Sequence, residues 1–124
     1  MSQVILAEDE AQLRRLISAM LMDRGVSVTE AADGAEALQR LQDDPSASLL
    51  LSDIVMPNMN GYELVEASLK LRPELKILMM TAYADQPDLA WSAVRLGANR
   101  VLSKPFDLKD LPPLVDQLNR SRPL

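Results

Sequence analysis

Residues 49–57 read LLLSDIVMP, and this stretch decides the fold. Its three leucines, Leu49–Leu51, form an apolar run without polar alternation, which is typical of a strand covered on both faces in a parallel sheet. Asp53 follows the run after a single serine and is itself followed by apolar residues. Because an isolated carboxylate is costly to bury, the stretch predicts a central strand that ends at a site where Asp53 meets a partner.

Four further apolar runs occur along the chain, and amphipathic segments separate them. The runs predict strands at Val4–Ala7, Val26–Thr29, Ile77–Met80 and Val101–Leu102. After each strand, apolar residues recur at three- and four-residue spacing, which predicts a helix. Five strands that alternate with five helices predict an α/β fold with an open, doubly wound, five-stranded parallel sheet rather than an eight-unit barrel.

Two prolines affect the last helix. Pro112 and Pro113 would disrupt a helix interior, because proline lacks a backbone donor and collides with the preceding turn, but proline suits the first helical turn. We therefore expect a short turn at Leu108–Asp110 and a regular helix only from about Pro112. Earlier in the chain, the pair Asp33–Gly34 predicts a turn between the second strand and the second helix.

The composition of the whole chain narrows the class of protein. Its 124 residues, 48% of them hydrophobic, predict a single domain over 1–124 with a core at about 3–120. The net charge of −5 disfavours direct nucleic-acid binding. No apolar run reaches the roughly 18 residues of a membrane span. The acidic residues after position 7 are unlike a signal peptide, so we expect a cytoplasmic protein.

The chain contains no cysteine and no histidine. This composition excludes disulfides, zinc sites built from these residues, thiol catalysis and any mechanism that requires an imidazole of this chain. A metal bound by these side chains must therefore be one that accepts oxygen ligands, such as Mg²⁺, Mn²⁺ or Ca²⁺.

Polar side chains follow four of the predicted strands, at the point where each strand ends. They are Glu8, Asp9 and Glu10 after the first strand, Asp53 after the third, Thr81 after the fourth and Lys104 after the fifth. Each has a plain structural explanation when taken singly, such as acids at the start of a helix or a lysine at the surface. Because a parallel sheet brings these ends to one edge, their joint placement favours a site.

Carboxylates a few ångströms apart repel one another, and a divalent cation relieves this repulsion. An oxygen-rich site without histidine suits Mg²⁺, and Lys104 supplies a second positive charge. Such a site suits phosphoryl transfer, in which the ionised Asp53 acts as nucleophile and forms an aspartyl phosphate without a general base. Mg²⁺, Lys104 and the Thr81 hydroxyl or a backbone N–H would then neutralise the three transferred oxygens.

These residues resemble the receiver domain of two-component response regulators, from Val4 to about Arg120. The matching segments are VILAEDE, LLLSDIVMPNMNG, ILMMTAYAD and GANRVLSKPF. The resemblance implies the flavodoxin-like strand order 2-1-3-4-5. It also implies the following roles: Asp53 as phosphoacceptor, Glu8 and Asp9 as the Mg²⁺-holding pair with Asp9 the direct ligand, the Val55 carbonyl as a further metal ligand, Thr81 and Lys104 at the phosphoryl group, and a cis peptide before Pro105.

Two positions depart from the usual pattern of the family. Glu8 stands where aspartate is commoner, and its longer side chain is expected to keep metal binding, directly or through water. Val101 stands where many members carry an aromatic residue whose rotation reports phosphorylation. We hypothesise that Tyr83 takes part of this switching role; the alternative is a loop residue that modulates access to the phosphoryl group.

The expected function is that of a signalling phosphoacceptor, not an enzyme, with intrinsic phosphoryl-transfer and autophosphatase chemistry. The expected partners are a sensor histidine kinase or a histidine phosphotransfer protein, and an output protein bound by the fourth helix, fifth strand and fifth helix. Trp91, the only tryptophan, lies off the apolar face of its helix and is either a binding anchor there or half buried. The initial methionine and short tail favour a stand-alone regulator over a fragment.

The sequence supports three other functions less well. A haloacid-dehalogenase-type phosphatase would carry a second acid two residues after the nucleophile, where this chain has Val55. A nucleotide-binding module would need a glycine-rich motif, which the four scattered glycines do not form. A phosphorylation-independent interaction domain with a receiver fold remains the main alternative, although Asp53, Thr81 and Lys104 are all intact.

Overall fold

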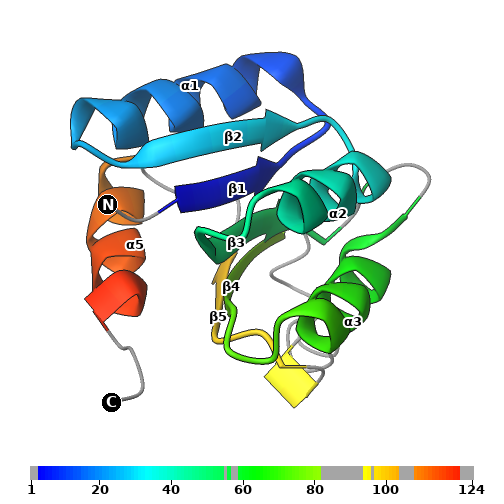
Figure 1. Cartoon of the computed structure of the whole chain (residues 1–124). Helices are drawn as coiled ribbons and strands as arrows, with labels where there is room; N and C mark the ends of the chain where they lie inside the picture. The colour runs from blue at the N-terminus through cyan, green and yellow to red at the C-terminus, as the bar shows by residue number, and fades with distance from the viewer. Residues whose placement is uncertain are drawn as a thin grey trace.

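Five parallel strands form one sheet in the order β2-β1-β3-β4-β5 (Figure 1). This computed structural model describes residues 3–54, 56, 59–81, 94–95, 97–103 and 108–120. The strands are β1 Gln3–Ala7, β2 Ser27–Ala31, β3 Ala47–Asp53, β4 Lys76–Thr81 and β5 Arg100–Ser103. The helices are α1 Ala11–Asp23, α2 Gly34–Asp43, α3 Gly61–Leu71, the 3₁₀ turn η1 Leu108–Asp110, and α5 Leu111–Arg120. The predicted doubly wound fold and its strand order are confirmed.

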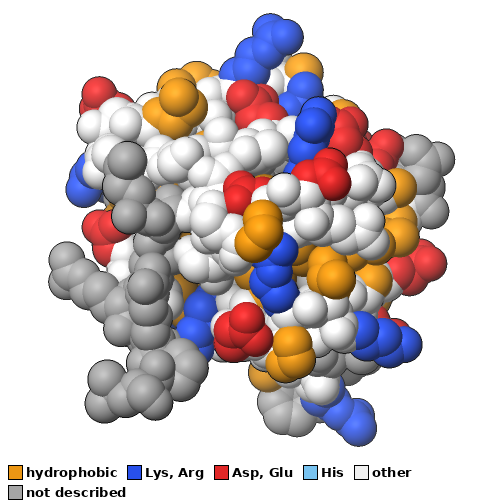
Figure 2. Space-filling view, in the orientation of Figure 1, with side chains coloured by type: hydrophobic (Ala, Val, Ile, Leu, Met, Phe, Trp, Pro, Cys, Tyr) orange, Lys and Arg blue, Asp and Glu red, His pale blue; other side chains and the backbone are white. Residues whose placement is uncertain are grey.

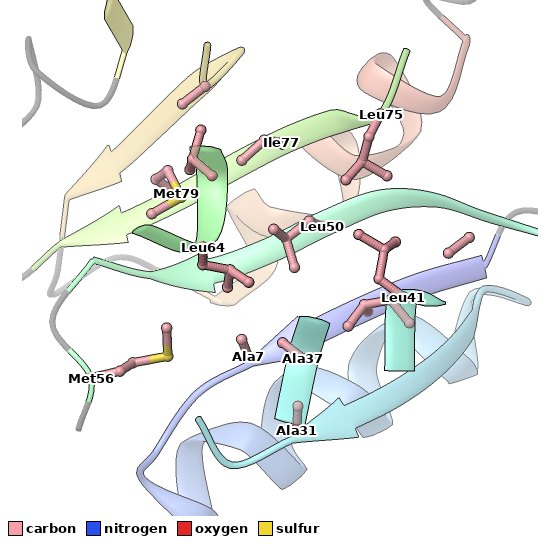
Figure 3. Packing of buried hydrophobic residues seen from close by; sticks show 14 of the residues in the cluster. Ala7, Ala31, Ala37, Leu41, Leu50, Met56, Leu64, Leu75, Ile77 and Met79 are labelled. Carbon is pink, nitrogen blue, oxygen red and sulfur yellow. The ribbon is translucent and has the colours of Figure 1, made fainter. Parts of the chain in front are cut away.

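The helices cover both faces of the sheet, α1 and α5 on one side and α2 and α3 on the other (Figure 1). Side chains alternate along each strand, so every central strand contributes to two cores. The α1/α5-side core contains Val4, Leu6, Ile17, Leu21, Leu49, Leu51, Leu78, Met80, Leu111, Val115 and Leu118. The α2/α3-side core includes Ile5, Ala7, Ala31, Ala37, Leu41, Leu50, Met56, Leu64, Leu75, Ile77 and Met79 (Figure 3). Burial on both faces explains the uninterrupted apolar run at Leu49–Leu51.

The observed ends of the elements refine the predicted ones. The third strand is longer than its apolar run, because its pairing with β4 continues as far as Asp53 opposite Met80. Asp33 is the N-cap of α2 and accepts a hydrogen bond from the Glu36 N–H at 2.8 Å, so the predicted turn is the start of the helix. The prolines behave as predicted, since η1 covers Leu108–Asp110 and α5 starts at Leu111.

The fourth predicted helix falls largely outside the described residues. Within the described part of the chain, no helix has the length and apolar composition needed to cross a membrane. On the face shown in Figure 2, acidic and basic side chains are interspersed with apolar ones.

Candidate functional site

The carboxyl ends of β1, β3 and β4 bring the predicted polar residues together. Ala7 pairs with Ser52, and Asp53 pairs with Met80, so the register places the ends of these three strands side by side. Glu8 follows β1 directly, while Asp53 and Thr81 are the last residues of their strands. All three are buried, although each is polar.

Glu8, Asp9 and Asp53 form an acidic cluster. Each offers a carboxylate oxygen, and these oxygens lie within 4.8 Å of one another. Glu8 is only 1% exposed and Asp53 7% exposed, whereas Asp9 is open to solvent. Three hard oxygen donors at this separation, two of them withdrawn from water, suit a cation such as Mg²⁺. The open side at Asp9 gives an ion and its remaining waters access to the cluster.

The turn that carries the first two acids is fixed by hydrogen bonds. The Glu8 N–H donates to the carbonyl oxygen of Ala31 at 3.1 Å, which ties the turn to the end of β2. The Glu10 N–H donates to Oε2 of Glu8 at 3.0 Å, so the Glu8 side chain folds back over the turn. Glu10 is the N-cap residue of α1, yet its side chain makes no capping hydrogen bond. The Glu10 side chain therefore does not cap α1.

The backbone around Asp53 is fixed on both sides of the residue. Before the loop, the Ser52 hydroxyl donates to the Asp53 carbonyl oxygen at 2.9 Å, and the Ile54 N–H donates to the Met80 carbonyl oxygen at 2.9 Å. After the loop, the Gly61 N–H donates to the Ile54 carbonyl oxygen at 2.6 Å. These bonds hold the end of β3 in place, so the carboxylate projects from a rigid element.

A capping box fixes the start of α3 at the far end of the same loop. The Glu63 N–H donates to the Asn60 side chain at 3.0 Å, and the Asn60 N–H donates to the Glu63 carboxylate at 3.3 Å. This reciprocal arrangement satisfies two backbone donors at the helix start. The loop between β3 and α3 is therefore anchored at both ends.

Val101 contributes to packing in this fold. It is paired with Met79 of β4 and packs, partly buried, against the α2/α3-side core.

The other predicted site residues lie outside the described part of the chain. They are Val55, Tyr83, Trp91, Lys104 and Pro105.

Arg14 contacts the acidic turn and Glu30 contacts Arg14, although the sequence pattern singled out neither residue. Nη1 of Arg14 donates to the carbonyl oxygen of Glu8 at 2.8 Å, and Nε of Arg14 donates to Oε1 of Glu30 at 3.1 Å. Arg14 falls between the apolar positions of α1, and Glu30 lies on the edge strand β2. No local pattern in the sequence connects the two, because their contact depends on how α1 packs on the sheet.

Comparison with known proteins identifies the family. The model of the response regulator receiver domain matches residues 4–116. The response regulator receiver protein CpdR of Brucella abortus is 42% identical over 118 residues, which cover 90% of this chain and 91% of that protein. The DNA-binding transcriptional regulator NtrC of Escherichia coli is 35% identical over 114 residues, which are 92% of this chain but 24% of NtrC.

Solved structures agree with this relationship. The chemotaxis protein CheY4 of Vibrio cholerae superposes with a TM-score of 0.88 at 32% sequence identity, over 95% of this chain and 98% of that one. A response regulator receiver domain protein from Clostridium thermocellum, at 24% identity and a TM-score of 0.89, shares the fold. The match over most of the chain, together with the acidic cluster at the carboxyl edge of the sheet, places this chain in the response regulator receiver domain family of two-component signalling.

Proposed function

We propose that Asp53 accepts a phosphoryl group from a phosphohistidine, with Mg²⁺ held by the acidic cluster. The observation that carries the proposal is the convergence of the Glu8, Asp9 and Asp53 oxygens within 4.8 Å of one another at the end of β3. Receiver domains interact with histidine kinases and output domains, so the phosphodonor is a sensor histidine kinase or a histidine phosphotransfer protein. The family relationship favours this function over a phosphorylation-independent interaction domain.

The proposed transfer needs little chemistry from the side chains. A carboxylate oxygen of Asp53 attacks the phosphorus, the phosphorus–nitrogen bond breaks, and the electron pair returns to the departing imidazole. Bound Mg²⁺ supplies neutralisation of the transferred oxygens, which is the main requirement of phosphoryl transfer. Thr81, buried beside Asp53 at the end of β4, donates its hydroxyl to one of these oxygens, and Lys104 pairs with another. Later attack of water on the phosphorus breaks its bond to the Asp53 oxygen, releases inorganic phosphate and restores the carboxylate.

The donor set supports Mg²⁺ as the cation. The sequence holds no histidine and no cysteine, and the described cluster consists of carboxylates alone. Mg²⁺ favours such oxygen ligands and keeps several waters, which the exposed side of Asp9 accommodates. The carbonyl of Val55 would complete the set of protein ligands.

The output step is proposed for a single receiver domain that spans 1–124. Phosphorylation would change how the surface of the fourth helix, β5 and α5 binds its partner, with Trp91 as the anchor. Because Val101 is aliphatic and packed against the α2/α3-side core, we assign part of the switch to Tyr83. The test compares amide spectra of the phosphorylated wild type and Tyr83→Ala. Unaltered phosphorylation-dependent shifts around β5 in the variant would contradict this role.

Incubation with acetyl phosphate and Mg²⁺, followed by intact mass measurement, tests the phosphoacceptor. We expect the wild type to gain the mass of one phosphoryl group and Asp53→Asn to gain none. Asp23→Asn is the matched control, because it makes the same change in an exposed acid at the end of α1 and should leave the gain intact. If the wild type gains no phosphoryl mass, or if Asp53→Asn still gains it, a phosphorylation-independent interaction domain would explain the protein better.

A further inference from the structure

Arg14 joins three parts of the fold at the edge of the acidic cluster. From α1 its guanidinium donates through Nη1 to the Glu8 carbonyl oxygen at 2.8 Å and through Nε to Glu30 of β2 at 3.1 Å. The side chain is 17% exposed. A guanidinium can make both bonds at once because its donors lie in a rigid planar fork. One side chain thus links the acidic turn, the first helix and the edge strand.

The bond to the Glu8 carbonyl has a geometric consequence for the cluster. A peptide unit is planar, so fixing the carbonyl of Glu8 also fixes the N–H and Cα of Asp9. The N–H of Glu8 is already tied to Ala31 and its carboxylate to the Glu10 N–H. Arg14 therefore controls the one backbone group of Glu8 that sets where Asp9 lies relative to Glu8 and Asp53.

Glu30 fixes Arg14 from the neighbouring strand. It is in register with Leu6, whose side chain belongs to the α1/α5-side core, so Glu30 also faces α1. Its side chain is 37% exposed, and a partly exposed ion pair of this kind contributes little to stability. The main effect of Glu30 is on the orientation of Arg14, because Glu30 holds the guanidinium where it can donate to the Glu8 carbonyl oxygen.

We propose that Arg14 and Glu30 form a positioning pair for the cation site: Arg14 holds the peptide between Glu8 and Asp9, and Glu30 holds Arg14. The inference rests on the proposed Mg²⁺ function and adds two residues that would set the affinity for the ion without touching it. Residues that orient metal ligands often change metal affinity by roughly ten-fold or more when they are removed.

Positioning and simple electrostatics predict opposite results for the same variant. Arg14 is a cation bonded to the backbone of Glu8 in the acidic turn, so removing its charge would by itself strengthen the attraction of the cluster for Mg²⁺. If Arg14 acts by positioning, its removal weakens Mg²⁺ binding despite the more negative site. The sign of the change therefore distinguishes the two effects.

The experiment measures Mg²⁺ affinity of the unphosphorylated full chain by titration calorimetry. We expect Arg14→Met to bind about ten-fold more weakly than the wild type. Arg15→Met is the matched control: it removes the same charge from the next residue of α1, whose side chain is exposed, and should bind as well as the wild type or slightly better. Glu30→Gln should weaken binding by a smaller factor, and should have no further effect in the Arg14→Met background if Glu30 acts only through Arg14.

A second readout needs no metal. The amide signal of Glu10, whose N–H bonds to the Glu8 carboxylate, should shift in metal-free Arg14→Met and stay in place in Arg15→Met. Arg14→Lys keeps the charge but not the planar fork, so it should also bind Mg²⁺ more weakly. If Arg14→Met does not fold by circular dichroism, Arg14→Lys and Glu30→Gln decide the question.

The outcomes separate the two proposals. A wild type that binds no Mg²⁺ overturns the proposed metal site and the positioning pair together. A wild type that binds Mg²⁺ while folded Arg14 variants bind it as tightly as Arg15→Met overturns the positioning pair alone.

Discussion

Gly61 lies so close to Ile54 that the end of β3 leaves no room for a side chain there. A Cβ on Gly61 would lie 2.6 Å from the Cα of Ile54 and 2.8 Å from the carbonyl oxygen of Asp53. The Gly61 N–H also donates to the Ile54 carbonyl oxygen. The first residue of α3 is thus pressed against the backbone that carries the proposed phosphoacceptor.

Gly61→Ala is therefore expected to disturb both stability and the site. The clash is with backbone atoms, which cannot rotate away, so we expect the free energy of unfolding in urea to fall by about 1–3 kcal/mol. We also expect slower phosphorylation by acetyl phosphate. Gly25→Asn is the control: Gly25 has a φ of 82° but nothing within 4 Å of the added Cβ, and asparagine tolerates this conformation. Equal losses in the two variants would contradict the steric argument.

Arg72, at the C-terminal end of α3, forms hydrogen bonds to two other elements. Its guanidinium donates to the carbonyl oxygen of Leu41 in α2 at 2.6 Å and to that of Ala47 in β3 at 3.2 Å. Arg72→Met would leave both carbonyls without this charged donor, and we expect the unfolding free energy to fall by about 1.5–3 kcal/mol.

Lys70→Met provides the comparison for Arg72. Lys70 pairs with Glu66 at 3.5 Å, but its side chain is 78% exposed. Exposed pairs of this kind contribute little, so the urea midpoint of Lys70→Met should stay close to that of the wild type. Equal losses in Lys70→Met and Arg72→Met would show that the lost positive charge, and not the two carbonyl contacts of Arg72, causes the destabilisation.

The apolar pattern of the sequence predicted the sheet because each central strand is buried on both faces. Leu49–Leu51 are fully buried, and the rule that strand ends share one edge was enough to predict that Glu8, Asp9 and Asp53 would meet. The ends of elements were harder to predict. β2 begins one residue later and extends two residues further than its apolar run, because its pairing with β1 continues to Ala31.

The sequence pattern could not predict the hydrogen bonds between side chains and backbone groups that lie far apart in the sequence. Asn99, for example, accepts a hydrogen bond from the Ile77 N–H at its Oδ1 and donates its own N–H to the Ile77 carbonyl, which fixes the entry to β5. The Arg14–Glu30 and Arg72 contacts are of the same kind. Each of these contacts depends on the distance between two packed elements. The periodicity of apolar residues and the spacing of motifs do not determine this distance.

Ser68 offers a substitution that should not destabilise the fold. Its side chain is fully buried on α3, and its hydroxyl has no hydrogen-bond partner among the described residues. An unsatisfied buried hydroxyl costs free energy, so we expect Ser68→Ala to keep or raise the urea midpoint. Ser52→Ala is the contrast, because that hydroxyl donates to the Asp53 carbonyl oxygen at 2.9 Å, and its loss should cost about 1 kcal/mol. Destabilisation by Ser68→Ala similar to that by Ser52→Ala would contradict this account.

Tyr62 should make the stability of the protein depend on pH in the alkaline range. It is the second residue of α3 and packs, partly buried, against the α2/α3-side core. Burial raises the pKa of its phenol above the ordinary value near 10. The unfolded chain therefore loses this proton at a lower pH than the folded chain does, and above about pH 10 the folded state holds more protons.

The sign of the effect follows from this difference in bound protons. The free energy of unfolding should fall as the pH rises above about 10, until the folded phenol ionises as well. Tyr62→Phe removes this part of the slope, whereas every other titratable group is present in both proteins and cancels in the comparison. Urea unfolding at pH 8 and at several values above pH 10 measures the slope for each protein, and any interaction lost with the hydroxyl appears as a constant offset. Parallel curves for the wild type and Tyr62→Phe would show that burial in α3 does not hold the phenol in its neutral form.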